Sequence, residues 1–160
     1  MAAAPAPLQT LVDRFDPEVF DVERTARVRL QGEDVGRWDV VLREHAATLQ
    51  PADDGARPDA VLTADERTRR RLAADVAGGM AAFRSGRLTV RHDLHLGVGF
   101  LAATAGASDG SALRFVRVKT ERGTISTMQA GSGSPVVLLH GLGATKASFL
   151  PTLAALAPTH

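Results

Sequence analysis

The segment Ala26-Arg27-Val28-Arg29-Leu30 carries an apolar side chain at every second residue. Because successive side chains of a β-strand point to opposite faces of a sheet, this alternation predicts a strand with one buried and one polar face. Residues 31–36 have the composition of a turn, and residues 38–43 then repeat the alternation. The two segments therefore predict a β-hairpin in an antiparallel sheet that is buried on one side.

Three shorter segments, at residues 47–49, 60–62 and 88–90, continue the strand pattern. The loops between the early strands are too short to hold crossover helices, so we expect antiparallel pairing. Residues 1–10 are rich in alanine and proline and are expected to be a flexible lead-in. Residues 106–112 have the small, polar composition of a linker.

Three helix starts can be recognised in the sequence. The pair Asp16-Pro17 fits an N-cap followed by the first helical position. The segment Thr63–Glu66 forms a capping box, which would open a helix that runs to about Asp75. Asp93 would cap a last helix. The apolar face of this last helix would consist of Leu94, Val98, Leu101 and Ala105.

Composition and charge exclude several kinds of function. The 160 residues carry a formal net charge of +1, with charges of both signs interspersed, which argues against a nucleic-acid or anionic-membrane partner. We expect no stable membrane insertion, because no segment is long and apolar enough to span a bilayer. The lack of cysteine and of a recognisable secretory signal favours a cytoplasmic location. The length allows one small domain and part of another.

The segments Pro58–Asp65 and Gly79–Val90, followed by Asp93 and an apolar helix, resemble the sterol carrier protein type 2 family over about residues 20–105. The resemblance implies an α+β fold in which helices cover one face of a mainly antiparallel five-stranded sheet. It also implies an apolar cavity that takes an apolar small molecule, such as a fatty acyl chain, a sterol or a similar lipid. We accordingly predict a lipid-binding domain over residues 11–105.

Lipid transfer requires apolar volume and a movable cover rather than a titrating group. For each candidate side chain, ordinary core packing is the alternative to contact with a lipid, and periodicity does not separate the two. The predicted lipid-binding residues are Trp38, Val40, Leu42, Met80, Phe83, Leu94, Val98, Phe100 and Leu101. We expect no cofactor and no metal, because His92 and His95 have the spacing of a metal pair but no third ligand nearby.

The stretch Pro135-Val136-Val137-Leu138-Leu139-His140-Gly141-Leu142-Gly143 has a different pattern, an almost continuous apolar run that ends in a glycine turn. Such a run predicts a strand buried on both faces, as in a parallel sheet covered by helices. A helix is expected to start near Thr145. The backbone N–H groups of the turn and helix would then point at one spot, where they could stabilise developing negative charge.

The order of elements in residues 113–160, two strands, a glycine-rich turn, the apolar run, His-Gly-x-Gly and a helix, resembles the opening of an α/β-hydrolase domain. The resemblance implies an incomplete α/β-hydrolase domain at residues 113–160, whose oxyanion hole uses the backbone N–H of Leu142 in a loop with His140 and Gly141. The complete protein would join a lipid carrier to serine-type ester hydrolysis. The alternative is a non-enzymatic lipid-transfer or lipid-sensing module.

A literal Gly-x-Ser-x-Gly pattern occurs at residues 106–110. A nucleophile elbow needs a buried strand before it and follows the His-Gly loop in the chain, whereas this pattern follows a helix and precedes that loop. We therefore reject it as a nucleophile. Without a nucleophile, an acid or a catalytic histidine, the chain is expected to be inactive as a hydrolase.

Overall fold

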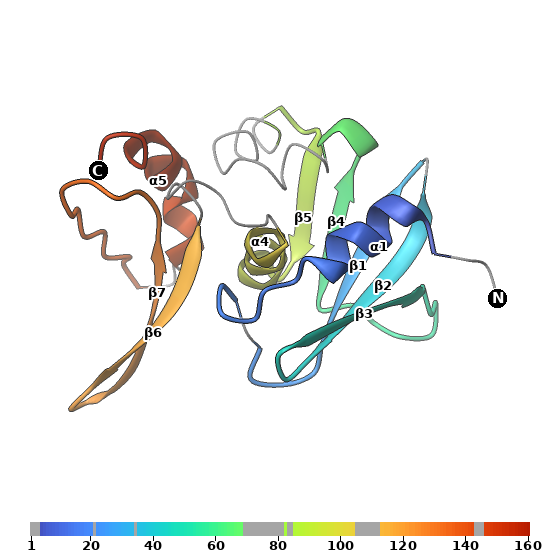
Figure 1. Ribbon diagram of the computed structural model, residues 1–160, viewed down its shortest axis with the longest axis horizontal. Helices are drawn as coiled ribbons and strands as arrows, with labels where there is room; N and C mark the ends of the chain where they lie inside the picture. The colour runs from blue at the N-terminus through green and yellow to red at the C-terminus, as the bar shows by residue number, and fades with distance from the viewer. Residues whose placement is uncertain are drawn as a thin grey trace.

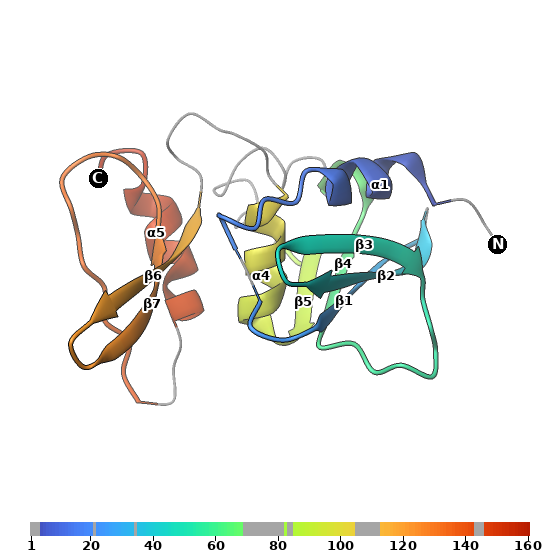
Figure 2. The same cartoon turned by 60° about the horizontal axis from the view of Figure 1, so that its bottom comes forward.

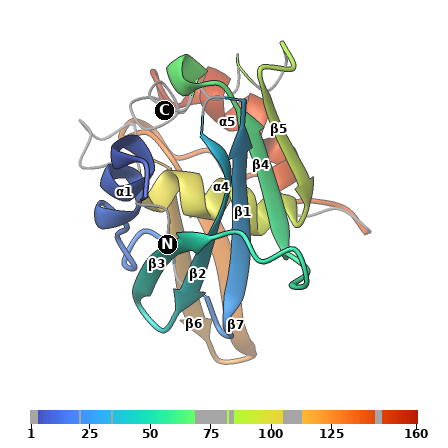
Figure 3. The ribbon, with the colours of Figure 1, turned by 90° about the vertical axis from the view of Figure 1, so that its right-hand side faces the viewer.

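The computed structural model describes residues 4–20, 22–33, 35–68, 82, 85–104, 113–142 and 146–160. Figure 1 shows a five-stranded sheet, a layer of helices beside it and a C-terminal part beyond the helices. The helix layer consists of α1 (Ala6–Asp13) and α4 (Leu94–Ala103). Both helices pack on the same face of the sheet (Figure 3). The expected α+β fold is confirmed for this part of the chain.

The sheet has the strand order β3-β2-β1-β4-β5. Its strands are β1 (Ala26–Gly32), β2 (Gly36–Arg43), β3 (Ala46–Pro51), β4 (Ala60–Ala64) and β5 (Leu88–His92). The predicted hairpin is confirmed, because β1 and β2 pair antiparallel with Val28 opposite Val40. Both of these side chains are fully buried against the helix layer. The alternation in the sequence therefore identifies the covered face correctly.

Strand β4 runs parallel to β1, which corrects the expectation that the early strands all pair antiparallel. The chain leaves β3 at one edge of the sheet, and residues 52–59, here called the crossover loop, carry it over the outer face to the far side of β1. This path crosses three interstrand spacings, about 14 Å. The loop can span up to about 26 Å when extended, so the connection needs no helix. The sheet is therefore mixed.

The N-terminal residues are more ordered than their composition suggested. Residues 6–10, expected to belong to a flexible lead-in, form the first turns of α1, and Leu8 is almost completely buried. The helix predicted to start at Asp16 does not form, because residues 17–19 make only a turn. The Asp16 carboxylate accepts a hydrogen bond from the N–H of Glu18 at 2.9 Å, so it stabilises that turn instead.

The helix start predicted at Thr63 lies two residues further along the chain. Strand β4 continues through Thr63 to Ala64, and the carboxylate of Asp65 accepts the N–H of Thr68 at 2.6 Å. Asp65 is therefore the N-cap of a helix that begins at residue 66. The remainder of the predicted helix, to Asp75, falls outside the described residues.

Asp93 caps α4 as predicted, with its carboxylate accepting the N–H of Leu96 at 2.9 Å. The side of α4 that faces the sheet differs from the prediction, since it carries Leu96, Phe100 and Ala103. Leu94 and Val98 instead pack against C-terminal residues. Because α4 is apolar nearly all around, spacing alone does not determine which side faces the sheet.

Two glycines of α4 allow the helix to lie close to its neighbours. A Cβ atom added at Gly97 would lie 2.5 Å from Cγ1 of Val90, and one added at Gly99 would lie 2.2 Å from the ring of Phe20. Real Cβ atoms essentially never approach other heavy atoms so closely. These positions therefore need glycine for close packing.

The C-terminal part begins with a two-stranded hairpin of β6 (Arg114–Thr120) and β7 (Gly123–Gln129). Figure 2 shows this hairpin and α5 (Leu150–Leu156) together on the side of α4 that faces away from the sheet. The 3₁₀ helix η1 (Lys146–Phe149) leads directly into α5. The order of two strands and then a helix agrees with the prediction, although the expected helix start at Thr145 lies outside the described residues.

The buried strand predicted at residues 136–139 does not form. The side chains of Val137 and Leu139 are 79% and 84% exposed. A strand buried on both faces needs neighbouring strands and helices on each side, whereas β6 and β7 pair only with each other in the described part of the chain. The apolar run therefore lies largely at the surface without regular secondary structure, and the described residues do not show the parallel sheet of an α/β-hydrolase.

Candidate functional site

The space between the sheet and the helices α1 and α4 is filled by apolar side chains, which we call the inner layer. It draws on both helices, on the strands and on the turn before β1. Its buried members are Leu8, Leu11, Val12, Phe20, Ala26, Val28, Leu30, Trp38, Val40, Leu42, Ala60, Leu62, Ala64, Ala82, Leu88, Leu96, Phe100 and Ala103. The inner layer is thus a packed apolar core with the sheet on one side and the helices on the other.

Several predicted lipid-binding residues lie in this layer. Val40, Leu42 and Phe100 are completely buried, and Leu101 packs against the layer while partly exposed. Trp38 is also buried, and its indole N–H donates to the carbonyl oxygen of Val35 at 2.9 Å, so its polar tip is satisfied. The structure brings these side chains from β2 and α4 together.

Four other predicted lipid-binding residues are not among the described members of the inner layer. Leu94 and Val98 are partly buried on the opposite side of α4, where they contact the C-terminal part and not the inner layer. The ring of Phe15, which sequence reasoning did not select, stacks on Phe100 with 6.4 Å between centroids. Two remaining candidates, Met80 and Phe83, fall outside the described residues.

The inner layer contains almost no polar chemistry. Among the described residues, the buried polar side chains on the helix side are threonines, and the Thr104 hydroxyl donates back to carbonyl oxygens of α4 at 3.1 Å. No buried carboxylate, lysine or histidine occurs among the described members of the layer. The described members of the layer therefore offer no group for acid–base or nucleophilic chemistry.

The outer face of the sheet buries a group of charges that sequence reasoning missed. Asp39 is completely buried and accepts hydrogen bonds from Arg29 at 2.8 and 3.1 Å and from Arg27 at 2.9 Å. The backbone N–H of Asp53 donates to the same carboxylate at 3.2 Å. Arg29 also donates to the carbonyl oxygens of Asp53 and Ala56. These bonds attach the crossover loop to the sheet.

The charged state of Asp39 is stabilised by its partners. Burial would raise its pKa, but the hydrogen bonds from Arg29, from Arg27 and from the loop outweigh burial, so the pKa lies below its ordinary value of 3.8. The bond to Asp39 in turn raises the pKa of Arg29. One sequence signal could have revealed the pair, because Arg29 and Asp39 are directly opposite in the hairpin register. Because Asp39 is completely buried and its hydrogen bonds are all made within the chain, we assign this group of charges to the fold rather than to a ligand.

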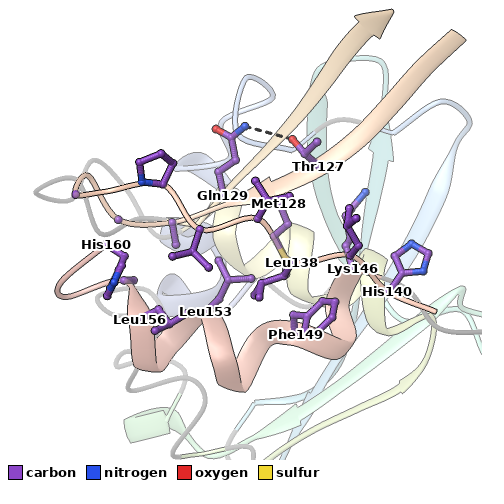
Figure 4. A pocket seen from close by; sticks show the side chains of 18 of the residues that line it. Thr127, Met128, Gln129, Leu138, His140, Lys146, Phe149, Leu153, Leu156 and His160 are labelled. Atoms are coloured by element: carbon purple, nitrogen blue, oxygen red, sulfur yellow. Dashed lines mark hydrogen bonds between the residues drawn. The ribbon is translucent and has the colours of Figure 1, made fainter. Parts of the chain in front are cut away.

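A pocket of about 610 Å³ lies in the C-terminal part, between β7, residues 135–140 and α5 (Figure 4). Apolar side chains, including Met128, Leu138 and Leu153, make up much of its lining. Lys146 also lines it, and its ammonium group donates to the Ser126 hydroxyl. The pocket is therefore apolar with a few polar groups, and it is separate from the inner layer.

The predicted oxyanion loop is exposed. His140 lines the pocket, and its Nδ1 lies 3.1 Å from the carbonyl oxygen of Gly141, so this side chain shapes the turn. Leu142 is fully exposed, and a Cβ atom added at Gly141 would meet nothing within 4 Å. In the described ranges, no serine occupies a strand-to-helix elbow beside this loop. The described structure therefore does not bring the loop N–H groups and a nucleophile together.

Two further kinds of site are not found in the part of the chain that the structure describes. No three His, Cys, Asp or Glu side chains gather as a metal site would require. None of the described helices has the length and apolarity needed to cross a membrane. His95, one of the two histidines with metal-pair spacing, instead lies among the rings of Phe20 and Phe115.

Comparison with known proteins gave a match for the same part of the chain. The model of the SCP-2 sterol transfer family matches residues 13–102. Among solved structures, a chain described as "UbiJ-SCP2 Ubiquinone synthesis protein" aligns with a TM-score of 0.46 and 19% sequence identity, covering 63% of this chain and 76% of that chain. No curated protein matched.

Proposed function

Since the chain belongs to the SCP-2 sterol transfer family, we propose that it binds an apolar lipid between its sheet and α4. The observation that carries this proposal is the composition of the inner layer, which is apolar throughout and lacks a titratable group among its described members. A carrier needs to bury an acyl chain or a ring system and to release it unchanged. The inner layer provides the burial and no means of altering the lipid.

Two surfaces would hold the lipid. Trp38, Val40 and Leu42 on β2 form the floor, and Phe100 and Leu101 on α4 form the cover. Met80 and Phe83 remain proposed members by family resemblance alone. We leave Leu94 and Val98 out of the proposed lining, because they pack on the other side of α4.

Binding should strengthen with the length of the acyl chain. Burial of one methylene group contributes about 0.8 kcal/mol, so each pair of added methylenes should tighten binding by about tenfold until the site is full. The matching fatty acid and fatty alcohol should bind about equally, because the described inner layer has no charged group to pair with a carboxylate. Competition of a series of both ligands against a fluorescent fatty acid measures these affinities.

A matched pair of variants controls this experiment. Leu101→Trp fills space beside the inner layer and should weaken binding by about tenfold or more. Leu139→Trp adds the same bulk at a side chain that is 84% exposed and should leave binding unchanged. Affinity that does not depend on chain length, or equal effects of the two variants, would count against the proposed site.

We propose, as a second candidate, an α/β-hydrolase opening at residues 113–160. The order of elements supports it: hairpin, apolar extended segment, His-Gly turn and helix. Under this proposal, the lipid-binding domain spans residues 11–105 and the incomplete hydrolase domain spans residues 113–160.

The chain itself should not hydrolyse esters. In the described residues no serine occupies a strand-to-helix elbow beside the His-Gly turn, so p-nitrophenyl acetate and p-nitrophenyl laurate should be hydrolysed no faster by the protein than by buffer. His140→Ala should give the same rate as the unaltered chain. Turnover above buffer that His140→Ala removes would show instead that this turn is catalytic.

A further inference from the structure

The side of α4 that faces away from the sheet is covered by the C-terminal part (Figures 1 and 2). Leu94 and Val98 on α4 pack with Leu113 and Leu150, which are both almost completely buried. The helix that covers the inner layer is therefore held from both sides. Any outward movement of α4 must first break these contacts.

A group of three rings joins the two parts. His95 of α4 lies 5.4 Å from the ring centroid of Phe20 and 5.2 Å from that of Phe115. Phe20 and Phe115 meet edge to face at 5.0 Å. Phe20 also occupies the space that Gly99 leaves open, so the same ring contacts α4, the inner layer and β6. We call His95, Phe20 and Phe115 the ring group.

Polar contacts at the same place fix the position of β6. The backbone N–H of Phe115 donates to the carbonyl oxygen of Val19 at 2.9 Å. Arg117 forms an ion pair with Glu23 at 3.2 Å, although both side chains are at least half exposed and the pair adds little by itself. The ring group is thus the centre of the contact between the two parts, and the polar bonds hold β6 beside it.

The imidazole of His95 is placed where a positive charge is unfavourable. Its Nδ1 is buried and has no hydrogen-bond partner among the described residues. Burial lowers the pKa of His95 below its ordinary value of 6.5, and the charge of Lys146 lowers it further, while Asp93 opposes both to a smaller extent. The position in the first turn of α4 also disfavours a cation, because the helix dipole is positive there.

Charged side chains also lie near the ring group. Lys146 on η1 lies 5.8 Å from the ring centroid of Phe115, and burial and the charge of Arg117 lower its pKa. Glu23, the partner of Arg117, is 80% exposed, and Asp93 caps α4. Of the two acidic groups, only Asp93 favours a proton on His95.

We propose that the C-terminal part is a clamp that holds α4 against the sheet and is released when His95 takes up a proton. The effect of release rests on the proposed function, since release would free α4 to admit or discharge a lipid. An undocked His95 is expected to titrate near its ordinary value of 6.5, and the docked one titrates lower. Protons therefore bind preferentially to the undocked state, and docking weakens as the pH falls below about 6.5.

Two spin labels on the full chain test the clamp without any lipid. The chain has no cysteine, so Arg43→Cys on β2 and Arg122→Cys at the tip of the β6–β7 hairpin can be labelled selectively. Pulsed electron paramagnetic resonance should give a narrow distribution of distances between the two labels at about pH 7.5 and a broad one at about pH 5. An unchanged distribution at the lower pH would overturn the proposal.

Three variants of the labelled chain separate titration from packing. His95→Phe keeps a ring but has no proton to gain, so its distribution should stay narrow at both pH values. His92→Phe makes the same change at an exposed histidine and should keep the pH response. Phe115→Ala removes a ring of the group and should give the broad distribution at both pH values. A pH response that survives in His95→Phe would rule His95 out as the switch.

A fluorescent fatty acid tests the consequence of release separately. Its rate of uptake should rise about tenfold or more between pH 7.5 and pH 5 in the unaltered chain and stay constant in His95→Phe. Distances that change while uptake rates do not would overturn the gating role. If no fatty acid binds at either pH, the proposed function fails while the distance measurements still decide the clamp.

Discussion

Replacing Asp39 by alanine is expected to lower the free energy of unfolding by about 3–5 kcal/mol. The substitution leaves the side chain of Arg29, which is only 10% exposed, without the carboxylate that it pairs with. It also removes the acceptor for the backbone N–H of Asp53, which helps to hold the crossover loop. Urea denaturation followed by Trp38 fluorescence measures the change.

The matched control for this substitution is Asp54→Ala. Asp54 pairs with Arg37 at 2.9 Å, but the two side chains are 66% and 55% exposed, so the loss should be at most about 1 kcal/mol. Equal losses for Asp39→Ala and Asp54→Ala would mean that the buried ion pairs do not stabilise the fold. A small loss for both would lead to the same conclusion.

The same carboxylate makes stability depend on pH in the acid range. The pKa of Asp39 is lower in the folded chain than its ordinary value of 3.8. Its contribution is therefore fully present above that value and is lost as the pH falls through the folded pKa. The difference in stability between the unaltered chain and Asp39→Ala should be constant near neutral pH and shrink below about pH 4.

Replacing Phe100 by alanine is expected to cost about 3–5 kcal/mol. Phe100 is completely buried in the inner layer and stacks on Phe15, so its removal leaves a cavity between α4 and the sheet. Leu139→Ala, at an exposed side chain, should change stability by no more than about 0.5 kcal/mol. Thermal unfolding of both variants measures the contrast.

The Phe100→Ala variant also reports on the lipid site. A fatty acid at about 100 times its dissociation constant should raise the free energy of unfolding of this variant by about 2.7 kcal/mol. The same ligand excess should stabilise the unaltered chain by the same amount. Stabilisation of Leu139→Ala by the same amount is expected too, because that side chain lies outside the site. A fatty acid that stabilises none of the three proteins would argue against a lipid bound by the folded chain.

Local patterns in the sequence were sufficient to predict the first hairpin and the N-cap of α4. Alternation identifies the inner face of β1 and β2, because the period of two is fixed by strand geometry. Asp93 is recognisable because its carboxylate acts on the very next turn. Trp38, Val40 and Leu42 could therefore be placed on the covered face of the sheet from the sequence alone.

Features that depend on distant segments could not be obtained in this way. The alternation places Asp39 on the outer face, but its burial comes from the crossover loop, whose path over that face no local pattern encodes. The parallel pairing of β4 has the same cause. Residues 136–139 have the composition of a buried strand, yet burial requires neighbouring strands that the described residues do not supply.

The ring group shows a related limit. His95 stood out in the sequence only by its spacing from His92, which suggested a metal pair. Its environment comes from Phe20 and Phe115, which lie far from it along the chain. Because α4 is apolar on nearly all sides, periodicity did not reveal that Leu94 and Val98 face a second contact.

If a lipid binds between α4 and the sheet, a spin-labelled fatty acid will report its position. In methyl NMR spectra of the intact chain, the bound label should broaden the signals of Val40, Leu62 and Leu96, which belong to the inner layer. The signals of Leu138 and Leu153, in the C-terminal pocket, should stay sharp. Broadening confined to Leu138 and Leu153, or no broadening at all, would contradict binding at this position.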